Sequence, residues 1–107
     1  MSKILQTKKQ PKELLLYGGT VVDPMREKSF KGDILIKNGS ISAIGDIKKK
    51  SSMTKINCND MIVTHGFCDI HAHFREPGRE DKETLFSGSQ SALAGGFTRV
   101  CVMPNTD

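Results

Sequence analysis

The part of the chain after residue 60 alternates between strand and helix patterns, and this alternation constrains the fold more than any other feature of the sequence. The apolar run MIV continues into GFCDIHAH, with a division at Gly66. Residues 83–94 place apolar and small side chains on one helical face, with Asp81 as the predicted N-cap and Gly95-Gly96 as the end. FTRVCVM is apolar and β-branched, which is typical of a strand buried on both faces. These spacings predict a parallel β-α-β unit with a right-handed crossover.

Before residue 60 the sequence predicts short strands and tight turns. The stretch ELLLYGGTVVDP predicts two short strands, separated at Gly18-Gly19 and ended by Asp23-Pro24. The next stretch, GDILIKNGSISAIGD, contains Asn38-Gly39, and both of these residues tolerate the positive φ that a type I′ turn requires. We therefore expect a hairpin at Asn38-Gly39 and a small antiparallel sheet.

The length of the chain limits how much of a larger fold it can contain. With 107 residues, of which 36% are hydrophobic and 26% charged, the chain has the composition of a soluble globular domain. A closed eight-stranded α/β barrel needs roughly 250 residues. The chain is therefore too short for a complete barrel of this kind.

Charge, cysteine content and apolar runs bear on the class of protein. The net charge of +4 includes the run Lys48 to Lys50, but serines follow this run and no aromatic residues interleave with it. We interpret it as a solvated loop and expect no nucleic-acid partner. The three cysteines, Cys58, Cys68 and Cys101, lack CxxC spacing, which indicates reduced thiols of a cytoplasmic protein, with Cys68 and Cys101 packing as small hydrophobes. The longest N-terminal apolar run, LLLY, is too short for a signal peptide or a membrane span.

Two polar motifs follow the two predicted strands of the β-α-β unit. HAHFREPG comes after the first strand, and MPNTD comes after the second. Because the carboxyl ends of parallel strands lie at the same edge of a sheet, where active sites gather, we expect the two motifs to lie close together. They form one candidate site.

The histidines of the first motif are candidate metal ligands. Side chains of a strand alternate between its faces, so His71 and His73 are expected to point the same way, and two imidazoles suit zinc. The alternative is a pair of structural histidines at a strand end. Asp69 has the same parity and would orient a ligand or make a structural hydrogen bond. His65 lies before Gly66, and we interpret it as structural.

Two further residues of the motifs are candidates for binding an anionic substrate. The guanidinium of Arg75 suits a carboxylate, which it can hold through two charge-assisted hydrogen bonds. The alternative is a surface arginine paired with Glu76 or Glu80. Asn105 offers both a donor and an acceptor after the second strand, although asparagine is also common in turns.

The sequence from residue 63 onward, VTHGFCDIHAHFREPG followed by GGFT and MPNT, resembles the opening of a dihydroorotase of the amidohydrolase superfamily. The strands before it resemble the first half of that family's small β-sandwich. The resemblance implies an α/β fold, incomplete in 107 residues, in which an N-terminal tail (1–12) and a partial β-sandwich (13–62) precede the first β-α-β of a (β/α)8 barrel (63–107).

By this resemblance His71 and His73 are zinc ligands, and Arg75 and Asn105 bind the substrate carboxylate. The resemblance also implies one or two zinc ions and a reaction that interconverts dihydroorotate and N-carbamoyl-aspartate in pyrimidine biosynthesis. The family's remaining histidines, its bridging carboxylate or carboxylated lysine and its catalytic aspartate come from later strands. We therefore expect no catalytic base within this chain and no activity of the chain alone.

Two alternatives stay open. One is an allantoinase or hydantoinase, although these relatives share the HxH pattern and typically lack the arginine two positions later. The other is a non-catalytic dihydroorotase-like protein that binds aspartate carbamoyltransferase, as some family members do. The expected partners are thus a small-molecule substrate and either a second copy of the chain or that transferase, with no membrane.

Overall fold

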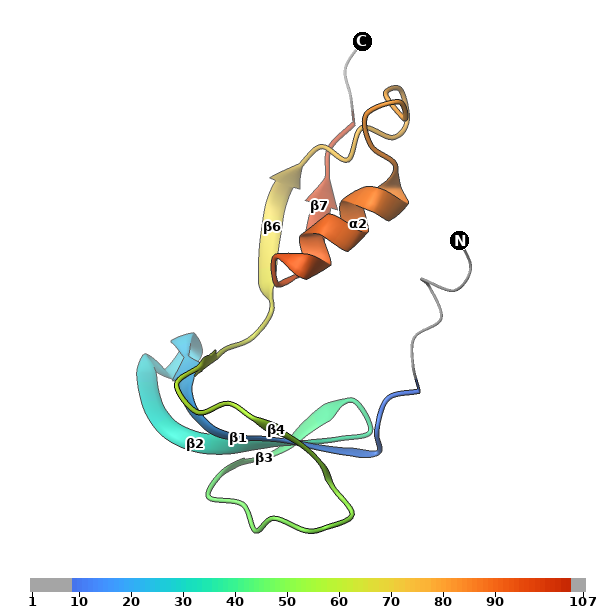
Figure 1. The fold of residues 1–107 in the computed structure, drawn as a ribbon. Coiled ribbons are helices and arrows are strands. Elements are labelled where there is room, and N and C mark those ends of the chain that lie inside the picture. Colours follow the sequence, from blue (N-terminus) through green and yellow to red (C-terminus); the bar gives the residue numbers. More distant parts are fainter. Residues whose placement is uncertain (1–8, 105–107) are drawn as a thin grey trace. The chain divides into compact units, whose positions relative to one another are not determined.

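The computed structural model describes residues 9–104, which divide into two compact units between Thr64 and His65. Each unit has its own β-sheet, as Figure 1 shows. The first unit contains strands β1 to β5, and the second contains strands β6 and β7 with helix α2 between them. No helix in this described part of the chain is long and apolar enough to cross a membrane.

The first unit is a mixed sheet. Its strands, with a short 3-10 helix after the first, are β1 (Glu13–Asp23), η1 (Pro24–Arg26), β2 (Lys28–Lys37), β3 (Ser40–Gly45), β4 (Thr54–Asn57) and β5 (Ile62–Val63). Strand β1 pairs antiparallel with β2 on one side, and β4 and β5 pair parallel with it on the other. The prediction of a purely antiparallel sheet is therefore wrong. The sequence of β4, TKIN, is short and exposed, so its pattern does not predict a pairing partner. Its partner is β1, about forty residues earlier, whose edge N–H and C=O groups need hydrogen-bond partners.

Strand β1 is continuous through Gly18-Gly19, so the predicted break into two strands is wrong. The glycines form a bulge instead, where the register with β2 shifts between Leu16 and Gly19 and Gly18 has a φ of 76°. The carboxylate of Asp33 stabilises the bulge by accepting hydrogen bonds from the backbone N–H of Gly18 (3.0 Å) and of Ile47 (3.2 Å). Bulges of this kind bend a strand without ending it.

The predicted hairpin at Asn38-Gly39 is confirmed. These two residues connect β2 to β3 and have φ values of 48° and 80°, as a type I′ turn requires. Leu15 of β1, Leu35 of β2 and Met53 form a buried core cluster, with Tyr17 and Ile47 packed against it. The lysines of the run 48–50 lie outside the strands and are exposed.

The second unit is the predicted parallel β-α-β. Strand β6 (Phe67–Ala72), helix α2 (Leu85–Ala94) and strand β7 (Phe97–Val102) follow one another, and β6 pairs parallel with β7. The helix begins after Thr84 rather than at Asp81, so the predicted N-cap is wrong. The side chain of Thr84 accepts a hydrogen bond from the N–H of Ser87, and the Ser87 hydroxyl accepts one from the N–H of Thr84, which is a capping box.

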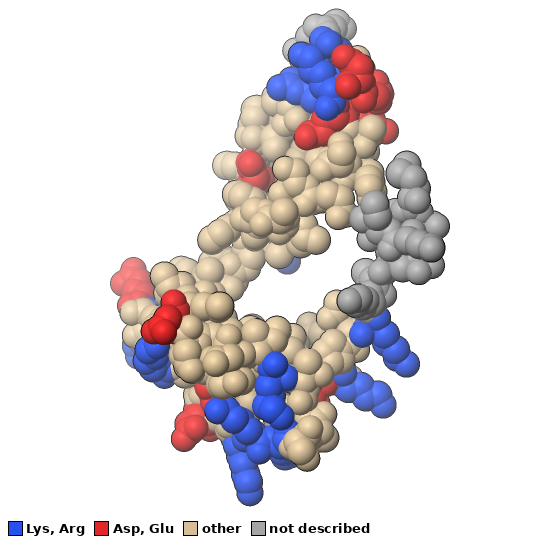
Figure 2. Space-filling view, in the orientation of Figure 1, with Lys and Arg blue, Asp and Glu red and all other residues tan. Residues whose placement is uncertain are grey.

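Asp81 pairs with Arg79 instead of capping the helix. The Arg79 Nε lies 3.0 Å from Asp81 Oδ1, and this contact lowers the pKa of the Asp81 carboxyl and raises the pKa of Arg79. Figure 2 shows acidic and basic side chains together at the end of the second unit where the loop 75–84 lies. The ion pair is therefore part of a mixed, solvated surface of both signs.

Strand β7 is not buried on both faces within the described residues, contrary to the prediction. Four of its six residues are exposed, and the free thiols of Cys68 and Cys101 are exposed as well, whereas Cys58 is buried. A single helix can cover only one face of a two-stranded sheet, so the other face of β6 and β7 stays exposed. Residues 9–104 thus contain one β-α-β unit of a mixed α/β architecture, and the closed barrel remains a prediction.

Candidate metal and substrate site

The segment from His71 to Glu76 alternates strictly between exposed and half-buried residues. His71, His73 and Arg75 are exposed, and the residues between them are half-buried. The segment begins in the last two residues of β6 and runs into the loop after that strand, although the earlier residues of β6 do not alternate in exposure. All three predicted binding residues of this motif are therefore exposed, and the half-buried residues between them pack against the rest of the unit.

The two histidines lie next to each other. Their ring centroids are 5.2 Å apart, and the ring planes meet at 66°. Two exposed imidazoles so placed fit part of a zinc site, because neutral imidazole nitrogen is a common zinc ligand. Within residues 9–104 no group of three or more His, Cys, Asp or Glu side chains gathers in a way that could hold a metal ion. In a zinc site of the usual four ligands, this pair would therefore account for two.

Asp69 supports the end of strand β6. Its Oδ1 accepts a hydrogen bond of 3.0 Å from the backbone N–H of His71, at a point where the register with β7 shifts between Asp69 and Ala72. The carboxylate therefore takes the place of a missing backbone partner in an irregular strand end. For Asp69 the sequence allowed two roles, a structural hydrogen bond and the orientation of a metal ligand. The hydrogen bond is present, and the orientation of a metal ligand stays a prediction.

The second motif meets the first at the carboxyl ends of the two strands. The N–H of Met103, just after β7, donates a hydrogen bond of 2.8 Å to the carbonyl of Ala72. The residues that follow β7 therefore start beside the histidine pair, as the parallel topology predicted. Asn105 lies outside the described residues, and its role as a carboxylate ligand stays a prediction.

Arg75 lies in the loop that connects β6 to α2. It is exposed, has a left-handed φ of 64°, and its carbonyl accepts a hydrogen bond of 2.7 Å from the N–H of Arg79. A positive φ is unusual for a residue with a side chain. The turn at Arg75 is thus held by the loop around it.

Phe74 and Gly88 anchor the motif to the helix, and the sequence analysis did not identify either residue. Gly88 is the buried residue of α2, and a Cβ on it would lie 2.7 Å from the Phe74 Cγ. A glycine inside an otherwise regular helical pattern was the signal that could have revealed this close approach. A small cavity of about 280 Å³ adjoins the contact, and its lining includes Asp69, His73 and Phe74.

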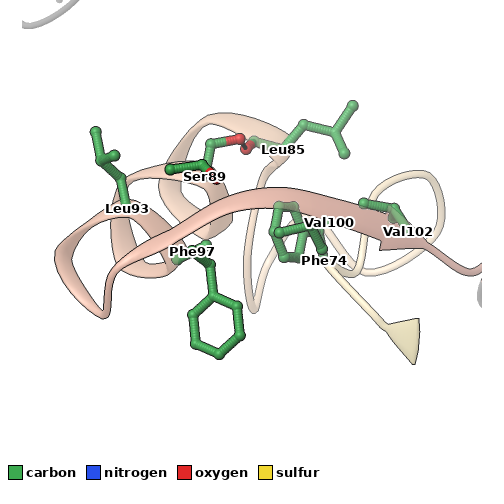
Figure 3. Close-up of a pocket in the computed structure, with 9 residues that line it drawn as sticks. Phe74, Leu85, Ser89, Leu93, Phe97, Val100 and Val102 are labelled. Atoms are coloured by element: carbon green, nitrogen blue, oxygen red, sulfur yellow. Dashed lines mark hydrogen bonds between the residues drawn. The ribbon is translucent and has the colours of Figure 1, made fainter. Parts of the chain in front are cut away.

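A larger groove on the same unit is apolar. Its volume is about 540 Å³, and Figure 3 shows its lining side chains on α2 and β7. Its lining residues are Phe74, Leu85, Ser89, Ala92, Leu93, Phe97, Thr98, Val100 and Val102. None of them is ionisable, so the groove offers burial for apolar groups and no acid-base chemistry.

The comparisons with known proteins agree with the motifs. Residues 60–107 match the family model described as Dihydro-orotase-like. Dihydroorotase from Clostridium botulinum (strain Eklund 17B / Type B) is 47% identical over 94 residues, which cover 88% of this chain and 23% of that protein. This chain is dihydroorotase-like. A second dihydroorotase, from Elusimicrobium minutum (strain Pei191), is 43% identical over 93 residues, covering 87% of the dihydroorotase-like chain and 22% of its relative.

The fold agrees with that of solved amidohydrolases. A crystal structure of D-hydantoinase superposes with a TM-score of 0.72 at 25% sequence identity, covering 89% of the dihydroorotase-like chain and 21% of the hydantoinase chain. The chain spans less than a quarter of the length of each of these three relatives. The relatives therefore identify the family of this segment, and the activity of a whole protein that contains it is a matter for proposal.

Proposed function

We propose that the chain is the N-terminal portion of a cytoplasmic, zinc-dependent dihydroorotase, which interconverts dihydroorotate and N-carbamoyl-aspartate in pyrimidine biosynthesis. The observation that carries the proposal is the shared exposure of His71, His73 and Arg75 at the carboxyl end of β6. Two imidazoles and a guanidinium thus lie within one short segment, which supports a metal site beside a site for an anion. The names and identities of the dihydroorotase relatives support the same reaction.

In this proposal His71 and His73 bind zinc through their imidazole nitrogens. A bound zinc ion supplies Lewis acidity, which polarises an amide carbonyl and activates water for attack. Asp69 holds the backbone of His71 through its hydrogen bond of 3.0 Å and so steadies the strand end that carries this ring. The remaining ligands and the general base come from residues outside the described segment.

Arg75 and Asn105 bind the substrate carboxylate in this proposal. The planar guanidinium of Arg75 can donate two parallel hydrogen bonds to a carboxylate. The hydrogen bond from Met103 to Ala72 brings the start of the second motif beside the first, which supports the convergence of both residues on one anion. Binding of the carboxylate orients the ring so that its amide faces the metal-binding histidines.

The same proposal extends to the fold of the whole protein. The β-α-β unit is the first of a (β/α)8 barrel, and the mixed sheet of residues 13–63 is part of a β-sandwich. The likeness to D-hydantoinase supports this arrangement. A homodimer, or a complex with aspartate carbamoyltransferase, is the proposed assembly.

The second candidate function is hydrolysis of another cyclic amide, which the D-hydantoinase likeness favours. The full-length protein that contains this chain should be assayed with dihydroorotate, hydantoin and allantoin, and its zinc content should be measured by mass spectrometry. We expect zinc in the protein and turnover of dihydroorotate above that of the other two rings. Preferred turnover of hydantoin or allantoin would replace the first proposal by the second, and a protein inactive on all three would refute both.

A further inference from the structure

The loop after the histidine pair is fastened to the start of helix α2 by Glu76. Its Oε2 accepts a hydrogen bond of 2.5 Å from the backbone N–H of Leu85, nine residues later. Leu85 is the first residue of the helix, and its N–H has no carbonyl partner within the helix. Glu76 is half-buried, and its negative charge is favourable at the positive end of the helix dipole.

The bond from Glu76 is separate from the capping box of the same helix. The box joins Thr84 and Ser87 to each other and involves neighbours in the sequence only. Glu76 instead joins the helix to the loop that carries Arg75. The helix could therefore keep its cap while the loop lost its attachment.

Arg75 stands between two attachment points. On one side Phe74 packs against Gly88, where no room remains for a Cβ. On the other side Glu76 binds the N–H of Leu85. Between them Arg75 has a positive φ, a conformation that costs free energy and persists only where the surrounding structure imposes it. The two attachments supply such a constraint from both sides.

We propose that Glu76 is a positioning residue for substrate recognition, which acts by holding the backbone of Arg75 in the orientation that presents its guanidinium to the substrate carboxylate. The inference rests on the proposed function, in which Arg75 binds that carboxylate. Glu76 itself touches neither substrate nor metal in this account. Its effect is selective for substrates that carry a carboxylate.

Kinetics of the full-length protein with Glu76→Ala, Glu76→Asp and Glu76→Gln test this role. The alanine variant removes the acceptor, and the aspartate variant shortens the side chain by one methylene. The glutamine variant keeps an oxygen that can accept the Leu85 N–H. Thr84→Ala is the matched control, because it weakens the same helix terminus without touching the loop.

We expect Glu76→Ala and Glu76→Asp to raise KM for dihydroorotate about tenfold, since small misplacements of a binding group have large kinetic effects. Turnover of a ring without a carboxylate, such as dihydrouracil, should change less than twofold, zinc content should stay the same, and Glu76→Gln should restore most of the affinity. Thr84→Ala should lower the melting temperature and leave KM unchanged. The aspartate variant keeps the test available if the alanine variant does not fold.

Two results would overturn the inference. One is an equal loss on both rings in the Glu76 variants, and the other is the same rise of KM in Thr84→Ala. Arg75→Gln, measured in parallel, separates this failure from a failure of the proposed function. If Arg75→Gln shows the carboxylate-selective loss and the Glu76 variants do not, only the role of Glu76 is wrong. If Arg75→Gln shows no selective loss, the recognition of the carboxylate by Arg75 is itself wrong.

Discussion

The imidazole rings of His71 and His73 lie with their centroids 5.2 Å apart at the carboxyl end of strand β6. Ala72 between them faces the other way and is half-buried. The hydrogen bond from the N–H of Met103 to the carbonyl of Ala72 ties this strand end to the end of β7. One pair of parallel strands thus brings the first motif and the start of the second to the same edge.

Replacing either histidine should remove tightly bound zinc from the full-length protein. His71→Ala and His73→Ala each delete one of the two proposed zinc ligands, and the described residues hold no other group of His, Cys, Asp or Glu that could take its place. Mass spectrometry of the purified variants gives the zinc content. His65→Ala is the control, since the His65 ring contacts Phe67 rather than the histidine pair, and it should retain zinc. Full zinc occupancy in both test variants would show that His71 and His73 are structural residues and not zinc ligands.

Gly88→Ala should destabilise the protein although alanine is the better helix former. Alanine gains about 1 kcal/mol of helix propensity over glycine, but its Cβ would lie 2.7 Å from the Phe74 ring, and overpacking of this kind costs about 1 to 3 kcal/mol. Thermal unfolding of the full-length protein should show a lower melting temperature. Ser89→Ala, at an exposed position of the same helix, should leave it equal or higher. An unchanged or higher melting temperature for Gly88→Ala would show that Phe74 moves aside freely.

The isolated 107-residue chain should lack dihydroorotase activity and should self-associate. The open edges of β6 and β7 and exposed apolar side chains such as Ile70 and Leu93 favour pairing with other chains. Light scattering coupled to size-exclusion chromatography measures the association, and a dihydroorotate assay measures the activity. A monodisperse monomer with measurable turnover is the result that this prediction excludes.

Local signals in the sequence predicted the features whose partners are close along the chain. The turn at Asn38-Gly39 depends on the φ values of two residues, and the β-α-β unit depends on patterns within about forty residues of each other. The histidine pair follows from the alternation of a single strand. These features are present in the structure.

Features that depend on a contact between two separate segments of the folded chain were missed or wrong. The parallel pairing of β4 with β1 joins residues about forty positions apart. The bulge at Gly18 is fixed by Asp33, and the N–H of Leu85 is bound by Glu76. In each case the local sequence allows several structures, and a contact made only in the folded chain selects one. The choice of Thr84 over Asp81 as N-cap is instead a local competition, because Arg79, two residues earlier, engages the Asp81 carboxylate.

The most direct test of carboxylate recognition is the kinetics of Arg75→Gln in the full-length protein. A bidentate contact from arginine contributes about 1.5 to 3 kcal/mol, so kcat/KM for dihydroorotate should fall roughly 10- to 150-fold. Zinc content should be unchanged, and dihydrouracil, which lacks the carboxylate, should lose far less. Arg79→Gln is the matched control, because Arg79 lies in the same loop and pairs with Asp81; it should leave both substrates near their original rates. An equal loss on both substrates in Arg75→Gln, or a loss of zinc, would contradict the role assigned to Arg75.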